Sequence, residues 1–150
     1  MESDTRQVID VLRVLKRPSR RSKYDNRVTY LGGERFDSVA EGAYYQRLVL
    51  LKAAGEVEDF HRQVRLDLGA GIAYVADFLV WMKGAAACGW FAVDVKGVLT
   101  KEFRLKARLF KDKFPSNQLI IAKAVYRGKQ IIGFNETVYG ERRKRHVDFQ

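Results

Sequence analysis

Hydrophobic residues alternate with polar ones in some parts of the chain and recur every three to four residues in others. Alternation is typical of half-buried β-strands, and the longer spacing is typical of amphipathic helices. The pattern predicts helices at residues 5–16, from 37 or 38 to 55, and 100–114. It predicts a small hairpin at residues 27–36 and strands at 62–68, 71–81, 90–96, 118–126 and 130–134.

The connections between these elements predict a mixed sheet. The short loop around residues 84–89 joins two consecutive strands, which implies an antiparallel part of the sheet. The helix between Lys96 and Gln118 implies a crossover to a parallel neighbour, so the fold class is α/β. On that helix we expect these core contacts: Phe103, Leu105, Leu109, Phe110 and Phe114.

The charge balance narrows the class of partner. The chain has 28 Lys and Arg against 18 Asp and Glu, a formal net charge of +10. Such an excess indicates a polyanion, either nucleic acid or an anionic membrane surface. The basic residues are spread along the chain rather than confined to one amphipathic helix, which disfavours a membrane.

The rest of the composition excludes several classes of protein. No apolar run approaches the roughly 20 residues of a membrane span, and no secretory signal is visible, so we expect a cytoplasmic protein. One cysteine excludes an internal disulfide framework. With only two histidines besides, a structural zinc site is disfavoured, and any metal would be held by carboxylates.

Three charged residues interrupt the apolar strands. Asp77 lies within the 71–81 strand, and Asp94 and Lys96 lie within the 90–96 strand. A carboxylate in a half-buried strand is normally paired or bound to metal, because burying it alone is costly. Asp94 and Lys96 are two residues apart and project from one face. If the two strands pair, Asp77 can reach the same face.

This set permits two interpretations. Two carboxylates offer the oxygen ligands that Mg²⁺ prefers, and a neighbouring lysine can orient water or stabilise charge on a phosphate. The alternative is an Asp94–Lys96 ion pair at a strand end, with Asp77 in a bulge. A D-x-K triplet is common by chance, so the spacing alone does not separate them.

Three further polar residues are candidates for the same site. Ser38 and Glu41 fit a capping box at the start of a helix, in which Glu41 reaches back to the cap. A carboxylate on that first turn is also compatible with metal binding, although the residue types favour capping. Gln63 alternates into its strand and either supports the metal ligands or is a plain polar strand residue.

Two basic segments are candidates for binding DNA. The first follows the N-terminal helix, and its expected DNA contacts are Arg17, Arg20, Arg21 and Lys23. The second is the helix at 100–114, where we expect Lys101, Arg104 and Lys111 to bind DNA. Clustered cations grip phosphate backbones, but they are equally often solvated surface.

These residues together resemble the PD-(D/E)xK nuclease superfamily, and most closely the small phage-encoded Holliday junction resolvases. The resemblance covers roughly Lys23 to Val125 and consists of an ordered set of short segments. The segments are Lys23-Tyr24, Phe36-Asp37-Ser38 with Glu41 and Tyr45, Gly55-Glu56-Val57, Tyr74-Val75-Ala76-Asp77-Phe78, Val93-Asp94-Val95-Lys96-Gly97 and Phe110-Lys111. Ala76 replaces the proline of the motif name, and Asp94 stands where resolvases often carry Glu.

The resemblance implies a restriction-endonuclease-like fold, with a central mixed sheet flanked by helices, over residues 23–134. It implies an active site of Asp77, Asp94 and Lys96, with Glu41 as a further ligand of Mg²⁺ or Mn²⁺. Water would attack phosphorus and leave 5′-phosphate and 3′-hydroxyl ends. Residues 1–22 and the basic tail at 135–150 lie outside this core.

The expected function is therefore metal-dependent resolution of four-way DNA junctions in recombination and repair. Two strands must be cut symmetrically, so we expect a homodimer, with the helix at 5–16 as a candidate dimer element. One alternative is a nuclease of the same fold that acts on flaps, mismatches or duplex DNA. Another is a basic DNA-binding protein without catalytic activity.

Overall fold

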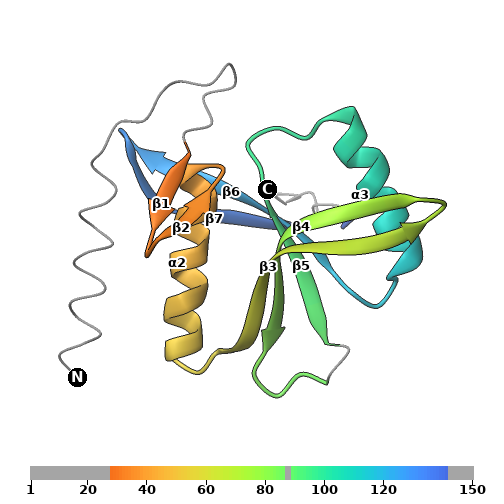
Figure 1. Cartoon of the computed structure of the whole chain (residues 1–150), viewed down its shortest axis with the longest axis horizontal. Helices are drawn as coiled ribbons and strands as arrows, with labels where there is room; N and C mark the ends of the chain where they lie inside the picture. Colours follow the sequence, from red (N-terminus) through yellow and green to blue (C-terminus); the bar gives the residue numbers. More distant parts are fainter. Residues whose placement is uncertain (1–27, 87–88, 142–150) are drawn as a thin grey trace, which may run out of the picture. The chain divides into compact units, whose positions relative to one another are not determined.

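The structure is a computed structural model of the chain, and it describes residues 28–86 and 89–141 (Figure 1). The helix expected at 5–16 and the basic residues Arg17, Arg20, Arg21 and Lys23 lie outside the described residues. The chain divides into two compact units, with the boundary between Ala53 and Ala54.

The first unit contains a short hairpin and a helix. Strands β1 (Thr29–Leu31) and β2 (Glu34–Phe36) pair antiparallel, as the Gly32-Gly33 turn predicts. Both turn glycines have positive φ, which glycine adopts without steric cost. Helix α2 (Val39–Ala53) packs on the hairpin at Gly42, where a Cβ atom would lie 2.9 Å from Leu31 Cδ1.

In its described residues, 54–86 and 89–141, the second unit is a five-stranded mixed sheet with one helix. In sheet order its strands are β3 (Val57–Gly69), β4 (Ile72–Met82), β5 (Trp90–Val95), β6 (Leu119–Arg127) and β7 (Gln130–Val138). Only β5 and β6 are parallel, and helix α3 (Lys101–Lys113) makes the crossover between them. The α/β class and the mixed sheet expected from the sequence are confirmed.

Two strands are longer than the sequence pattern predicts. β3 begins at Val57 rather than at residue 62, because its first residues pair with the far end of β4, starting from Met82. These positions include Glu58 and Asp59, two adjacent charged residues that interrupt the alternation of apolar and polar residues. β7 continues to Val138, where it pairs with Ile120 of β6.

Helix α3 covers one face of this sheet with a narrow apolar stripe. Phe103, Ala107 and Phe110 are buried against core residues of β4, β5 and β6. The prediction that Leu105 is a core contact is wrong, since its side chain is 57% exposed. At 100° per residue, Leu105 lies about 200° from Phe103, and the small side chain of Ala107 takes the buried place. Neither α2 nor α3, the two helices of the described residues, is long and apolar enough to span a membrane.

Side-chain alternation changes phase in the middle of both β3 and β4. In β4, Ala76 and Leu79 belong to the same core beneath α3, although they are three residues apart. In β3, Val64 packs against this core, and His61 contacts the ring of Trp81, which also packs against it. Regular strands return to one face every two residues, so a spacing of three requires a local irregularity.

The irregularity in β3 is at Gln63. This residue has a φ of 49°, in the left-handed region that side-chain-bearing residues rarely adopt. Holding a residue other than glycine there costs about 1–3 kcal/mol. Arg62 pairs with Phe78 and Val64 with Ala76, so Gln63 stands opposite Asp77, the residue at which β4 changes phase. The strain therefore lies beside the carboxylate that the sequence analysis selected.

Candidate active site

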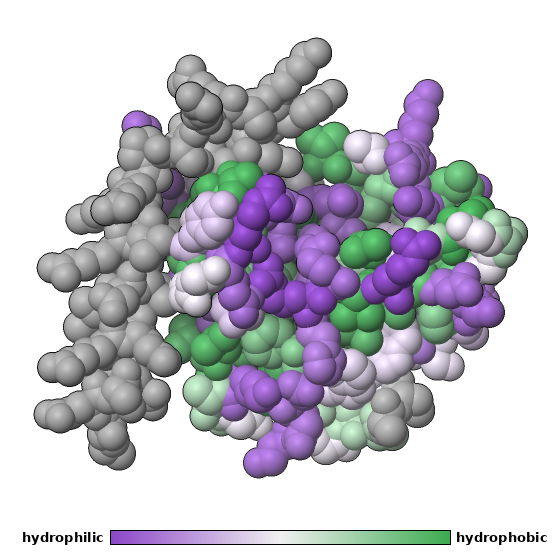
Figure 2. Space-filling view, viewed as in Figure 1, coloured by the Kyte–Doolittle hydropathy of each residue, from purple (hydrophilic) through white to green (hydrophobic). Residues whose placement is uncertain are grey.

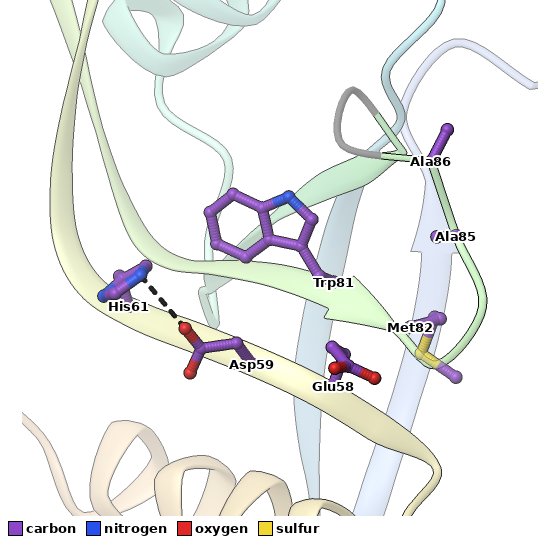
Figure 3. Close-up of a pocket in the computed structure, with 7 residues that line it drawn as sticks. All are labelled: Glu58, Asp59, His61, Trp81, Met82, Ala85 and Ala86. Carbon is purple, nitrogen blue, oxygen red and sulfur yellow. Dashed lines mark ion pairs between the residues drawn. The ribbon is translucent and has the colours of Figure 1, made fainter.

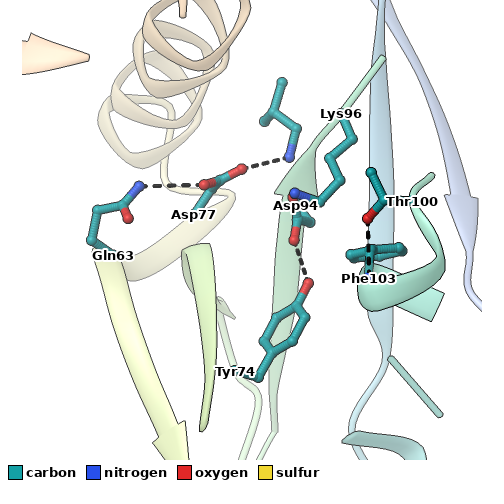
Figure 4. Close-up of polar contacts among 8 residues, drawn as sticks. Gln63, Tyr74, Asp77, Asp94, Lys96, Thr100 and Phe103 are labelled. Carbon is teal, nitrogen blue, oxygen red and sulfur yellow. Dashed lines mark hydrogen bonds and ion pairs between the residues drawn. The ribbon is translucent and has the colours of Figure 1, made fainter. Parts of the chain in front are cut away.

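Asp77 lies where β4 and β5 separate. The two strands pair from Trp81 and Trp90 as far as Phe78 and Val93. One position further, the same register places Asp77 opposite Asp94. There the Asp77 side chain, rather than the backbone of β4, is the hydrogen-bond acceptor for β5. Its Oδ2 accepts the backbone N–H of Val95 at 2.8 Å (Figure 4).

The other oxygen of Asp77 is held from the opposite side. Gln63 on β3 donates its side-chain amide to Asp77 Oδ1 at 3.3 Å. The carboxylate thus lies between a side chain of β3 and the backbone of β5, and Figure 4 shows both contacts. Each carboxylate oxygen has two lone pairs, so an oxygen that accepts a hydrogen bond can also bind a cation.

Asp94 is one of two buried charged residues in the described part of the chain, with 2% of its surface exposed. Its Oδ2 accepts a short hydrogen bond from the hydroxyl group of Tyr74. Its Oδ1 lies 3.1 Å from Lys96 Nζ, in an ion pair without hydrogen-bond geometry. The expected pairing of Asp94 with Lys96 is therefore present, and one buried carboxylate oxygen has no hydrogen bond.

Tyr74 is a site residue that the sequence analysis missed. Burial, together with the charge and the hydrogen bond of Asp94, raises the pKa of Tyr74 far above its usual value of about 10. The phenol therefore keeps its proton and remains a donor to Asp94. Tyr74 lies three residues before Asp77, but only the β4–β5 arrangement shows that its hydroxyl group reaches Asp94.

Lys96 is held between Asp94 and the start of α3. Its Nζ atom lies 5.2 Å from the centre of the Phe103 ring, close enough for a cation–π contact. Thr100 caps α3 by accepting the backbone N–H of Phe103 at 3.1 Å, which fixes the first turn and this ring. About one third of the Lys96 side chain is exposed, so the side chain is anchored yet partly open to solvent.

The donor set fits a hard divalent cation such as Mg²⁺. Mg²⁺ is commonly bound by one or two carboxylates, with water and substrate phosphate completing the octahedron. Asp77 and Asp94 would supply those carboxylates, and the buried Asp94 Oδ1 without a hydrogen bond suits such a ligand. Among residues 28–86 and 89–141, no three His, Cys, Asp or Glu side chains gather as a metal-binding group.

Ser38 and Glu41 belong to the first unit, at the start of α2. Ser38 Oγ accepts the backbone N–H of Glu41 at 3.0 Å, so the part of the capping box predicted for Ser38 is confirmed. Glu41 is only 5% exposed, which is unusual for an ionisable group that serves only as a cap. Its role as a metal ligand stays a prediction.

A row of four cations follows the exposed side of α3. Lys101, Arg104, Arg108 and Lys111 are exposed and recur at intervals of three or four residues, which places them on one stripe. None of the four forms an ion pair with a residue of the described ranges. Lys106 differs, because it pairs with Glu102 at 3.1 Å. We call this row the α3 ridge, and Figure 2 shows hydrophilic side chains projecting where α3 lies, at the upper right.

A shallow hollow of about 300 Å³ lies at the end of the β3–β4 pair that contains Glu58 and Met82 (Figure 3). His61 lines it, with its ring edge-on to Trp81 and its Nε2 atom 3.4 Å from Asp59 Oδ2. These contacts indicate a structural role for His61. The hollow contains neither Asp77 nor Asp94, so it adds nothing to the candidate active site.

Comparison with known proteins gives a family without an assigned activity. Residues 21–128 match the family described as "Protein of unknown function (DUF1064)", and the chain belongs to this family. The matched range includes Glu41, Asp77, Asp94, Lys96 and the whole of α3. No curated protein matches the chain.

Proposed function

We propose that this member of the DUF1064 family is a divalent-metal-dependent endonuclease of the PD-(D/E)xK type that cleaves four-way DNA junctions. The observation that carries the proposal is the grouping of Asp77, Asp94 and Lys96 where β4 and β5 separate. A buried carboxylate beside a partly exposed lysine is costly to maintain, and a hydrolytic site gives a reason to maintain it.

Each residue has a defined part in the proposed chemistry. Asp77 and Asp94 would hold the metal, and Tyr74 would keep Asp94 oriented through its hydrogen bond. A bound Mg²⁺ would supply positive charge to the scissile phosphate and lower the pKa of water. Lys96 would orient the attacking water or stabilise the negative charge that develops on the phosphate. Water adds to phosphorus as the P–O3′ bond breaks, which leaves a 5′-phosphate and a 3′-hydroxyl group.

The α3 ridge is the proposed path of the DNA backbone. It begins five residues after Lys96, at Lys101, and extends over ten residues, a rise of about 15 Å. Successive phosphates on one strand of duplex DNA rise by about 3.4 Å along the helix axis. A ridge that runs parallel to this axis therefore covers the rise of about four phosphates. Cations without carboxylate partners are available to replace the counterions of those phosphates. Two such sites, one on each protomer of a homodimer, would allow symmetric cleavage of a junction.

The decisive experiment compares DNA substrates under single-turnover conditions. A labelled four-way junction and a linear duplex of the same sequence are incubated with the protein, with and without Mg²⁺. We expect metal-dependent cleavage of the junction, symmetric about its centre, and slower cleavage of the duplex. Asp94→Asn is the matched control, since it keeps the size and an acceptor for Tyr74 but removes the charge.

Other outcomes would select the alternatives. Preferred cleavage of flaps, mismatches or duplex would keep the chemistry and change the substrate. DNA binding without cleavage at any metal concentration would favour a non-catalytic DNA-binding protein. That alternative has one observation in its favour, because the Asp94–Lys96 ion pair neutralises both groups without a metal.

A further inference from the structure

Two residues other than glycine have a left-handed backbone among residues 28–86 and 89–141, and only one of them lies in a turn. Ala70 has a φ of 52° and lies between Gly69 and Gly71, in the tight turn that joins β3 to β4. Gln63 has a φ of 49° in the middle of the 13-residue strand β3. The strand does not turn there, although its side-chain alternation changes phase at this residue.

The side chain of Gln63 contacts Asp77. The amide donates to Asp77 Oδ1 at 3.3 Å, while the Val95 N–H holds Oδ2 at 2.8 Å. One donor on each oxygen fixes the rotation of the carboxylate about its Cβ–Cγ bond. An amide is neutral, so unlike a lysine it orients the carboxylate without neutralising the charge that a metal needs.

The residue type supports a role for the side chain rather than for the bend alone. Glycine adopts positive φ without a steric penalty, so a position needed only for a bend in the strand would be best served by glycine. The chain instead has glutamine there and bears the strain. Strained residues of this kind cluster at active sites, where the surrounding structure holds them.

We infer that Gln63 is a positioning residue, whose amide orients the Asp77 carboxylate for the metal. This inference rests on the proposed metal-dependent nuclease. Residues that hydrogen-bond to metal ligands typically contribute 10- to 100-fold to metal affinity or activity. Gln63 is exposed and does not belong to the hydrophobic core, so its replacement should affect the site more than the fold.

Two variants separate positioning from a purely structural role. Gln63→Gly removes the amide and relieves the backbone strain, so its melting temperature should equal or exceed that of the wild type. Cleavage of the four-way junction at saturating DNA should be at least about tenfold slower, and the half-saturating Mn²⁺ concentration at least about tenfold higher. Gln63→Glu keeps the size but places a negative charge against Asp77, and it should show the same losses without relief of strain.

Ala70→Gly is the matched control. It relieves a comparable left-handed residue in the same hairpin, away from Asp77. It should raise the melting temperature to a similar degree and leave cleavage and Mn²⁺ binding unchanged. Wild-type cleavage rates and Mn²⁺ affinity in Gln63→Gly would overturn the inference. Slower cleavage together with a lower melting temperature and unchanged Mn²⁺ affinity would also overturn it, because it would show a structural role.

Direct titration of the protein with Mn²⁺ distinguishes a failure of the inference about Gln63 from a failure of the proposed nuclease function. A wild-type protein that binds Mn²⁺ through Asp94, but cleaves no DNA, would refute the nuclease. The isotherms of Gln63→Gly and the wild type would still decide the role of Gln63. A wild-type protein that neither cleaves DNA nor binds Mn²⁺ would overturn both proposals.

Discussion

Asp77 Oδ2 accepts the backbone N–H of Val95 at 2.8 Å, so a side chain completes the hydrogen bonding of β5 where β4 leaves it. This relationship gives Asp77 a structural role whatever its chemical role. Removing the side chain would leave a backbone N–H of β5 without its acceptor, at a cost of about 1–3 kcal/mol. A test of the chemistry must therefore preserve this hydrogen bond.

Asp77→Asn meets that requirement. Its side-chain oxygen can still accept from Val95, and the Gln63 amide can rotate to accept from the new NH₂ group. We expect loss of junction cleavage with little change in the free energy of unfolding or in junction affinity. Asp77→Ala should lose cleavage and also about 1–3 kcal/mol of stability by urea unfolding. Near-normal turnover in Asp77→Asn would contradict a metal role.

Tyr74→Phe tests the buried hydrogen bond to Asp94. A hydrogen bond to a charged group contributes about 1.5–3 kcal/mol, so the variant should be less stable than the wild type by that amount at pH 8. Its cleavage rate should fall because Asp94 is no longer oriented. Urea unfolding at pH 8 and single-turnover cleavage check the two effects, and unchanged stability would contradict the hydrogen bond.

The raised pKa of Tyr74 makes the same pair sensitive to alkaline pH. Above about pH 10, the tyrosine loses its proton in the unfolded chain but keeps it in the folded protein. Stability from this group is therefore complete below pH 10 and is lost as the pH rises. The stability advantage over Tyr74→Phe should shrink by about 1.4 kcal/mol per pH unit above pH 10. Unfolding curves between pH 9 and 11 measure this, and a constant difference would contradict it.

Lys96 distinguishes catalysis from charge neutralisation. If it contacts the transition state, Lys96→Ala should lower turnover at saturating DNA and metal by about 100-fold or more, with little effect on affinity. Lys96→Arg should rescue poorly, because a planar guanidinium group does not match a compact ammonium group beside Asp94. If Lys96 only neutralises Asp94, Lys96→Met should lower the melting temperature and keep turnover, and Lys96→Arg should be tolerated.

The α3 ridge predicts a measurable salt dependence. If each of its four cations contacts one phosphate, neutralising all four to Gln should reduce the slope of log K against log salt by about 3.6 on duplex DNA. The matched control neutralises four exposed cations elsewhere in the second unit: Lys83, Lys123, Arg127 and Lys129. An equal effect in both variants would show general attraction rather than a defined DNA path.

Glu41→Gln separates helix capping from metal binding. Gln also serves in a capping box, and the hydrogen bond from the Glu41 N–H to Ser38 involves the backbone, so stability should change little. If Glu41 binds metal, cleavage should collapse and the metal requirement should rise. Normal cleavage would assign Glu41 to the helix cap, and Ser38→Ala would then be expected to lower stability by about 1 kcal/mol.

Most of the elements and the main candidates of the site were predictable from the local pattern of residues. The Gly32-Gly33 turn, the Ser38 cap and the apolar stripe of α3 depend on residues close together in the chain. Asp77, Asp94 and Lys96 were identifiable because charged residues conflict with the apolar pattern of their own strands. Such conflicts are visible locally, as are the periods of two and of 3.6 residues.

How these residues meet depends on the pairing of strands in the folded protein. The hydrogen bond from Gln63 to Asp77 spans 14 residues and that from Tyr74 to Asp94 spans 20, so both depend on strand register. The left-handed conformation of Gln63 has no signal in composition or periodicity, because glutamine rarely adopts it. Leu105 is exposed for a similar reason, since the width of the buried stripe is set by the sheet that α3 covers. Local pattern selects which side chains are available, and the pairing of distant strands selects which of them touch.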